Sequence, residues 1–294
     1  METLVYIVPS IDVSWDGFGP LNPGKNYSVT PPPLDECLKD AELIVELLKE
    51  LHEGKSALTI FSGTYCRNEF MRPPFTEIWN RIEKQGGEIL LHTHEETAGN
   101  GTHHGEESHM KSVIRYQFDF LKEIGLHPVG YRGGLYAYCS FLTPLLEELG
   151  IPIDLSSAPG CNKPEREAVW DNIPYSAFFL SRNDPNRLPC EEEKSQVFEI
   201  PLGADGEGGE NINFLYIDYV DSDLENSKRI YDVVLSRARN ENCPQIIYTL
   251  FHTFSAHKPR MIERYKQFVD YTQKNGAQAV NPTEARKIYE SISS

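Results

Sequence analysis

The amino-acid sequence predicts a single α/β domain in which a parallel sheet curls into a barrel. Short apolar runs alternate with helix-like stretches through most of the 294 residues, which is typical of parallel strands joined by crossover helices. Residues suited to metal binding and proton transfer follow several of these runs, and α/β folds build their sites at the carboxyl ends of strands. A hydrophobic fraction of 39% supplies enough apolar side chains for one large core.

The expected strands are apolar runs that are too short for helices. In chain order they lie at 4–8, 56–62, 88–91, 128–131, 151–155, 197–202, 246–251 and 277–280. The expected helices carry apolar residues on one stripe, and several end at glycine. They lie at 34–52, 75–84, 110–124, 143–149, 263–274 and from 283 onwards. We expect the domain to span 1–294, with an irregular insertion around 156–195, where prolines and charges are frequent and periodicity is weak.

Composition limits the partners and the location of the protein. A formal net charge of −16 and a pI near 5.0 should repel nucleic acid and anionic membrane surfaces, so neither is expected as a partner. No run approaches the ~20 apolar residues of a membrane span, and the first residues lack a signal-type segment. The cysteines are scattered without a CxxC pair, which favours reduced thiols. We therefore expect a cytoplasmic protein, of open oligomeric state.

Two histidines separated by one residue, His92 and His94, follow the expected strand at 88–91. Side chains two residues apart on a strand point to the same face. A single ion could therefore contact both imidazoles, which are the commonest side-chain metal ligands. The alternative is a polar loop whose histidines have no role, and this motif alone does not decide between the two.

Further polar residues lie at the ends of other expected strands. They are Asp12, Asp16, Arg132, Asp154 and His252. A carboxylate with two imidazoles suits a divalent ion such as zinc and leaves a position for water. Hydrolysis also needs a base and an acid. The second aspartate could be the base, oriented by Arg132, and His252 could be the acid.

Each of these residues has a structural alternative. Asp12 and Asp16 could be turn residues, Arg132 could lie on the surface, and Asp154 could cap or orient. The polar residues that follow His94 are expected to be solvated, although one of them could be a further metal ligand. They are Glu96, His103, His104 and His109.

The order and spacing of these residues resemble those of the NodB-type polysaccharide deacetylases, carbohydrate esterase family 4 and its relatives. The resemblance covers about residues 4–290. Its motifs are Ser10-Ile11-Asp12-Val13-Ser14-Trp15-Asp16, Gly87-Glu88-Ile89-Leu90-Leu91-His92-Thr93-His94, Tyr131-Arg132-Gly133-Gly134-Leu135-Tyr136, Leu149-Gly150-Ile151-Pro152-Ile153-Asp154 and Leu250-Phe251-His252. It implies a distorted (β/α)7-type NodB barrel and a metal-dependent hydrolase that removes an acyl group from an amide on a sugar.

The resemblance also implies roles for individual residues. The implied catalytic residues are Asp12, Arg132 and His252. The implied ligands of a divalent ion, zinc first with cobalt, nickel or manganese as alternatives, are Asp16, His92 and His94. Which aspartate is the base and which the ligand stays open. The implied substrate is a nucleotide-sugar, a lipid-linked sugar or a small amide, in surface-polysaccharide biosynthesis.

The sequence departs from the family pattern at several points. Asp12 and Asp16 replace an adjacent Asp-Asp pair, and Glu96 stands where the second histidine of His-x-x-x-His would lie. The Arg-Pro-Pro-Tyr-Gly loop has become Arg132-Gly-Gly-Leu-Tyr. These changes leave the expectation of metal binding in place but weaken the expectation that chitin or peptidoglycan is the substrate. The alternative function is a non-catalytic carbohydrate-binding protein on a decayed deacetylase fold.

Overall fold

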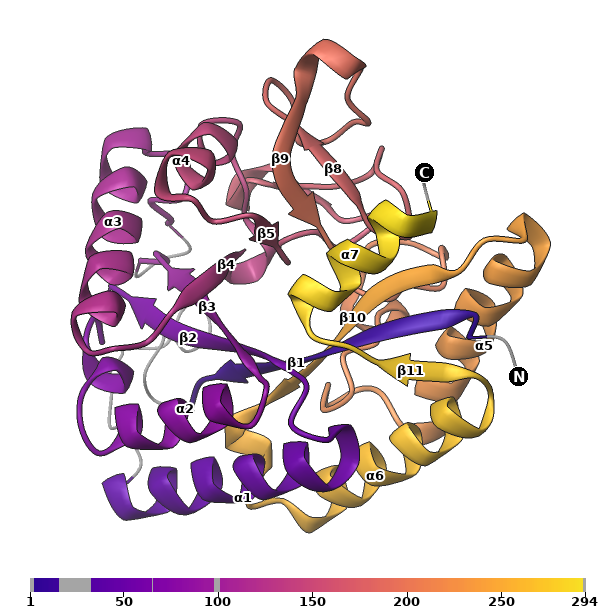
Figure 1. The fold of residues 1–294 in the computed structure, drawn as a ribbon, viewed down its shortest axis with the longest axis horizontal. Helices are drawn as coiled ribbons and strands as arrows, with labels where there is room; N and C mark the ends of the chain where they lie inside the picture. The colour runs from indigo at the N-terminus through magenta and orange to yellow at the C-terminus, as the bar shows by residue number, and fades with distance from the viewer. Residues whose placement is uncertain (1–2, 16–32, 65, 98–100, 293–294) are drawn as a thin grey trace.

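The protein, seen here in a computed structural model, is built around one curled sheet of nine strands (Figure 1). The structure describes residues 3–15, 33–64, 66–97 and 101–292. In sheet order the strands are β10 (Gln245–His252), β1 (Val5–Val13), β2 (Ala57–Gly63), β3 (Glu88–His94), β4 (Pro128–Gly133), β5 (Ile153–Asp154), β9 (Lys194–Glu199) and β8 (Phe178–Ser181), with β11 (Ala277–Ala279) paired to β1.

The sheet is parallel from β10 to β9 and curls so that its ends approach each other. β8 is antiparallel to β9. The chain that follows β9 returns to β10 at the other end of the sheet, where Leu202 bridges Tyr248 and Tyr216 bridges Leu250. The predicted distorted barrel is therefore confirmed, in the form of a curled half-barrel that isolated bridges link across its open side.

β1 sets the register of the strand ends. It pairs with β10 along most of its length, and this pairing places Asp12 opposite His252. Its carboxyl-terminal half also pairs with β2, which places Asp12 opposite Thr59, while its amino-terminal half pairs with β11. Every residue of β1 except Tyr6 is buried, as expected of a parallel strand that is covered on both faces.

Helices cover the outside of the curled sheet, except the last one, α7 (Pro282–Ile292), which lies within the ring of strands in this view (Figure 1). The outer helices are α1 (Leu34–His52), α2 (Phe75–Lys84), α3 (Glu107–Glu123), α4 (Leu142–Leu149), α5 (Leu224–Glu241) and α6 (Pro259–Lys274). Each described helix buries one stripe of apolar residues, and in α1 this stripe includes Ala41, Ile44 and Leu48. Gly150 ends α4 in the left-handed conformation, with φ of 70°, as the sequence predicts.

The structure differs from the expected elements in several places. β1 and β3 continue to Val13 and His94, so Asp12, His92 and His94 lie within the last residues of strands. Asp12 and His92 are buried and His94 is half-buried, and hydrogen bonds to these polar side chains compensate their burial. The sequence pattern does not predict α5, whose apolar residues are interspersed with charged ones. Its start is fixed by Asp223, whose side chain accepts a hydrogen bond from the Asn226 backbone.

The segment 156–195, expected to be irregular, contains short strands. β6 (Asn162–Lys163) and β7 (Ala168–Val169) form a small antiparallel pair. β8 joins the main sheet through β9. This segment therefore extends the sheet instead of forming only a surface loop.

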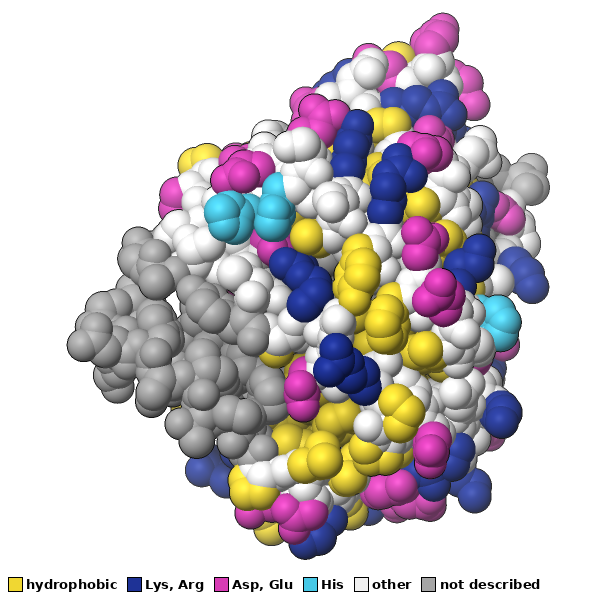
Figure 2. Space-filling model, turned by 90° about the vertical axis from the view of Figure 1, so that its left-hand side faces the viewer, with side chains coloured by type: hydrophobic (Ala, Val, Ile, Leu, Met, Phe, Trp, Pro, Cys, Tyr) yellow, Lys and Arg dark blue, Asp and Glu magenta, His cyan; other side chains and the backbone are white. Residues whose placement is uncertain are grey.

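The face of the molecule at the left-hand side of Figure 1 carries charges of both signs. On this face, Lys and Arg side chains are interspersed with Asp and Glu, and hydrophobic side chains gather in a band (Figure 2). Its described side chains form no large patch of one charge sign, which would steer a charged partner. Within the described ranges, no helix is long and apolar enough to cross a lipid bilayer.

Candidate active site

The ends of neighbouring strands bring a buried ion pair together. The Arg132 guanidinium, from β4, donates to Asp12 Oδ1 at 2.6 Å. Thr59, from β2, donates its hydroxyl to the same oxygen at 2.6 Å. Asp12 and Arg132 are each only 3% exposed. One carboxylate oxygen of Asp12 is thus held by two donors, which fixes the side chain and leaves Oδ2 available.

The second oxygen of Asp12 faces two imidazole rings. His92 Nε2 lies 3.5 Å from Oδ2, and His252 Nε2 lies 3.6 Å from it. Burial alone would raise the pKa of Asp12, but the nearby Arg132, His92 and His252 outweigh it and lower this pKa to about 2. Asp12 is therefore an ionised carboxylate at neutral pH, placed between two histidines.

His92 and His94 turn their Nε2 atoms toward each other at a distance of 3.0 Å. His92 Nδ1 lies 3.0 Å from the Arg132 carbonyl oxygen, which can only accept a hydrogen bond. His94 Nδ1 lies 3.0 Å from both oxygens of the Glu96 carboxylate. Each Nδ1 therefore carries a proton, and in the neutral rings both Nε2 atoms present lone pairs to the same point.

This arrangement suits a metal ion. Histidines that bind metals commonly donate their other nitrogen to a carbonyl or a carboxylate, which fixes the ring and its tautomer, and both rings do so here. Bonds of ~2.0–2.1 Å to a tetrahedral zinc place two nitrogens about 3.3 Å apart, close to the observed 3.0 Å. The two donors fit, but within the described ranges no set of three His, Cys, Asp or Glu side chains could hold an ion.

Without an ion, the surroundings shift the pKa values of the two histidines in opposite directions. Burial is the main cause that lowers the pKa of His92 to about 3. Burial also acts on His94, but the adjacent Glu96 carboxylate outweighs it and raises the pKa of His94 above its usual value. A proton on His94 Nε2 would then be donated to His92 Nε2. A proton and a metal ion would therefore compete for this position.

Glu96 and His104 are buried, contrary to the expectation that they lie in a solvated loop. Their exposed fractions are 7% and 2%, and Glu96 forms an isolated antiparallel bridge with Thr102. The Glu96 carboxylate accepts from His94 Nδ1 and lies 3.3 Å from His104 Nε2. Glu96 thus contacts Nδ1 of His94, the nitrogen that faces away from His92. His103 instead pairs with Glu106 near the surface.

His252 ends β10 on the other side of Asp12, and Asp218 holds its ring. One Asp218 oxygen accepts the His252 backbone N–H at 3.0 Å, and the other lies 3.2 Å from Nδ1. Phe254 stacks on the ring with centroids 4.7 Å apart. The hydroxyl of Tyr216 lies 3.5 Å from Nε2. Asp218 therefore fixes Nδ1–H, so that Nε2 faces Asp12 and can exchange a proton.

No protein-family model matches the chain, and no curated protein matches it significantly. Solved structures do match. A candidate polysaccharide deacetylase from Mycobacterium smegmatis has a TM-score of 0.60 at 15% identity, over 99% of this chain and 91% of that chain. A candidate glycoside hydrolase or deacetylase from Parabacteroides distasonis has a TM-score of 0.64 at 13% identity, over 99% and 71%.

The chain has the fold of the NodB-type polysaccharide deacetylases. The PuuE allantoinase is a further neighbour, with a TM-score of 0.58 at 14% identity over 98% of this chain and 91% of that chain. Proteins with different named activities thus share this deacetylase fold. Since a fold hosts many activities, the function has to be argued from the side chains of the site.

On this deacetylase fold, most of the site residues predicted from sequence come together. Asp12, His92, His94, Arg132 and His252 lie in one cluster of direct contacts. Asp16 lies outside the described residues. Asp154 contacts Ser156 instead, which donates to it from its hydroxyl at 2.8 Å, and it is paired with Glu199 across β5 and β9.

Sequence reasoning missed two residues of this cluster. Thr59 lies within an apolar strand, and only the β1–β2 register brings it to Asp12. Asp218 lies in the chain between β9 and α5, where no pattern marks it. Its only signal is a carboxylate among aromatic residues, Tyr216 to Tyr219, which by itself is too weak to indicate a site.

Proposed function

We propose that the protein is a metal-dependent hydrolase that removes an acyl group from an amide nitrogen on a sugar. The observation that carries this proposal is the position of the ionised Asp12. It lies between the paired nitrogens of His92 and His94 on one side and the Asp218-held His252 on the other. A base flanked by a metal-type pair and a separate acid is the constellation that amide hydrolysis needs.

His92 and His94 would hold the ion, zinc or alternatively cobalt, nickel or manganese, with Asp16 as the proposed third ligand. When bound, the ion would acidify a water molecule and polarise the acyl carbonyl. Acidification of the water is needed because a carboxylate with a pKa of about 2, such as Asp12, is a weak base. The Arg132 carbonyl oxygen and the Glu96 carboxylate would accept from Nδ1 of His92 and of His94, respectively, and so fix the two rings.

The chain's own residues divide the proton transfers between them. Asp12 Oδ2 would accept the proton of the attacking water, while Arg132 and Thr59 hold Oδ1 and keep the carboxylate oriented. His252 would donate a proton from Nε2 to the leaving amine, with Asp218 balancing the charge of the imidazolium. The contact between Asp12 and Arg132 supports the proposal that Asp12 is the base and Asp16 the ligand.

The substrate class is proposed from the same fold and the composition. A nucleotide-sugar, a lipid-linked sugar or a small amide in the cytoplasm, within surface-polysaccharide biosynthesis, is the substrate that we propose. The thiols of Cys139, Cys161, Cys190 and Cys243 form no disulfide, which agrees with a reducing compartment.

The test is a screen of acyl release by the purified protein. The protein is stripped of metal, loaded separately with zinc, cobalt, nickel or manganese, and offered N-acylated amino sugars, free and nucleotide-linked. We expect one loaded form to release acid, and His92→Ala to bind little metal and to lose this activity. His127→Ala, at a histidine whose side chain is 79% exposed, is the matched control. Equal metal content in wild type and His92→Ala would refute the proposed centre.

A second candidate is a non-catalytic carbohydrate-binding protein. The observation that favours it is Glu96, which stands where the family's second histidine would lie and is engaged with His94 and His104. In that case the screen would detect no acyl release with any of the metals, while calorimetry with the same sugars would detect binding.

A further inference from the structure

Arg264 is a buried cation on a helix outside the barrel. It lies on α6, and only 6% of it is exposed. Its Nη1 donates to the carbonyl oxygens of Ile217 at 3.0 Å and Tyr219 at 3.1 Å. These two carbonyls flank Asp218 in the chain. One guanidinium nitrogen thus ties down the backbone on both sides of this aspartate.

Asp218 in turn determines the geometry of His252. Its two oxygens accept the backbone N–H and face Nδ1 of His252, at 3.0 and 3.2 Å. The same segment is tied to β10 by the backbone hydrogen bond from Ile217 N to Leu250 O at 2.9 Å. Between the guanidinium of Arg264 and the ring of His252 there is therefore only the short stretch 217–219.

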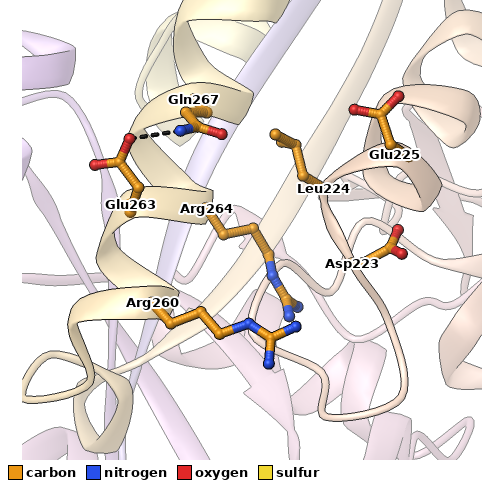
Figure 3. A pocket seen from close by; sticks show the side chains of 7 residues that line it. All are labelled: Asp223, Leu224, Glu225, Arg260, Glu263, Arg264 and Gln267. Atoms are coloured by element: carbon orange, nitrogen blue, oxygen red, sulfur yellow. Dashed lines mark hydrogen bonds between the residues drawn. The ribbon is translucent and has the colours of Figure 1, made fainter.

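The carboxylates near Arg264 are engaged with other partners. Arg264 lines a pocket of about 300 Å³ between α6 and the start of α5, shown in Figure 3 with its guanidinium directed into the space between the two helices. Asp223 accepts from the Asn226 backbone, Glu225 pairs with Lys228 and Glu263 accepts from Gln267. The described contacts of Arg264 are thus directed to the backbone around Asp218.

Burial of the Arg264 guanidinium carries a desolvation penalty, and filling the space at this position does not require a charged side chain. Burial lowers the pKa of Arg264, and the neighbouring Arg260 adds to this effect, while Asp223 and Asp218 oppose it. An apolar side chain of similar length would fill the same space without a desolvation penalty. The hydrogen bonds to the carbonyl oxygens of Ile217 and Tyr219 therefore account for a buried cation at this position.

We propose that Arg264 is a positioning residue for His252. By fixing the carbonyls of Ile217 and Tyr219, it holds Asp218 in the one orientation that accepts Nδ1–H and leaves Nε2 facing Asp12. Its effect on catalysis rests on the proposed function, whereas its effect on the ring of His252 does not.

The matched control is Arg260, which lines the same pocket one turn earlier on α6 and points into it (Figure 3). Unlike Arg264, it is exposed. The test compares Arg264→Gln, which is too short to reach both carbonyls, with Arg264→Lys, which retains length and charge, and with Arg260→Gln. Arg264→Met, of similar length and apolar, takes the place of Arg264→Gln if circular dichroism shows that the latter does not fold.

The primary readout is the tautomer of His252, measured by ¹⁵N NMR of histidine-labelled protein at one pH, with the signal assigned through His252→Gln. We expect a single Nδ1–H tautomer in the wild type and in Arg260→Gln, a mixture of tautomers in Arg264→Gln, and substantial rescue in Arg264→Lys. A wild-type tautomer in folded Arg264→Gln, or the same mixture in Arg260→Gln, would overturn the proposal.

The second readout separates this proposal from the proposed function. If the wild type releases acyl groups, Arg264→Gln should lower kcat about tenfold with little change in KM, a part of the ~10²–10⁴-fold that a positioned acid supplies. An unchanged kcat beside an altered tautomer would contradict the role of His252 as acid. If Arg264→Gln alters the tautomer of His252 and the wild type releases no acyl group, the proposed function is refuted and the positioning role of Arg264 stands.

Discussion

Two buried aspartates end strands of the same sheet and differ in everything that surrounds them. Asp12 on β1 is surrounded by Arg132 and two imidazoles. Asp154 on β5 is paired with a second carboxyl group, Glu199, and accepts from Ser156. Their exposed fractions are 3% and 0%, so burial alone does not distinguish them.

The surroundings of these aspartates shift their pKa values in opposite directions. Cations and imidazoles overcome burial and lower the pKa of Asp12 to about 2. Burial raises the pKa of Asp154 to about 6. Burial and the adjacent Asp154 raise the pKa of Glu199 well above its usual value. Because two buried carboxyl groups side by side cannot both ionise readily, this pair retains a proton. A strand end becomes a candidate site through the charged groups that meet there. Of these two aspartates, Asp12 is the one whose free oxygen faces imidazole nitrogens.

Loss of the acid should have the largest effect on the Asp12 side. His252→Ala should keep the fold and the metal but lower the rate for an amide by ~10²–10⁴-fold, the usual contribution of a positioned acid. A substrate with a good leaving group needs less protonation, so its rate should fall much less. Steady-state kinetics on an amide and an activated ester measure this difference. Equal losses on both substrates, or loss of metal, would make His252 a ligand or a packing residue.

Removal of the cation beside Asp12 should destabilise the protein strongly. Arg132→Met leaves an unpaired buried carboxylate and should lower the free energy of unfolding by about 3–5 kcal/mol. Asp12→Asn in the same chain should restore much of this loss, since the charge is gone. Urea unfolding of both variants measures the effect. Arg132→Lys, which keeps the charge, should lower kcat with little change in KM, and a pure KM effect would point to substrate contact instead.

The support behind His94 should have a moderate effect. Glu96→Gln replaces the carboxylate that accepts from His94 Nδ1 with a neutral amide, and loss of such a partner typically weakens metal affinity ~10–100-fold. Competition with a chelator measures the affinity of the variant against wild type. Glu106→Gln, next to the more exposed His103, is the control. Unchanged affinity in Glu96→Gln would remove Glu96 from the metal centre.

The pH dependence of stability should have opposite signs at the two aspartates. Because folding raises the pKa values of Asp154 and Glu199, their stabilising contribution is present below the unfolded pKa near ~4. The contribution of Asp154 is lost as the pH rises through about 6, and that of Glu199 is lost as its own raised pKa is passed. Glu199→Gln removes one of these carboxyl groups, so the fall in the free energy of unfolding between about pH 5 and pH 8 should be smaller by about 1–3 kcal/mol.

Asp12 supplies the contrasting measurement. Its pKa is lowered to about 2, so its contribution is present above the unfolded pKa near ~4 and is lost as the pH falls toward about 2. Asp12→Asn should therefore flatten the acid side of the stability curve and leave the neutral side unchanged. Urea unfolding across the pH range measures both variants, and an unchanged neutral slope in Glu199→Gln would contradict the shared proton.

The comparison also separates what sequence could predict from what it could not. Periodicity predicts the strand that carries Asp12 and the helix α1 well, because local apolar spacing determines both. It also locates His92, His94, Arg132 and His252 at strand ends, which meet on one edge of a curled parallel sheet. The fold and most of the cluster were therefore accessible from local patterns.

The remaining contacts depend on register and on loops. Thr59 reaches Asp12 only because β2 pairs with the second half of β1. The segment 217–219, which links Arg264 to His252 through Asp218, has no periodic pattern, and tertiary contacts determine its position. Asp154 has the same strand-end signal as Asp12, and its different role follows from Glu199 on another strand. Such long-range neighbours leave no local trace in one sequence.

The most direct test compares the two aspartates in the same assay. Asp12→Asn and Asp154→Asn each remove one buried carboxyl group from a strand end, and both proteins are checked for fold and for metal content. We expect Asp12→Asn to retain metal and lose acyl release, and Asp154→Asn to keep activity near that of the wild type. An active Asp12→Asn, or a folded Asp154→Asn that is as inactive as Asp12→Asn, would contradict the assignment of Asp12 as the base.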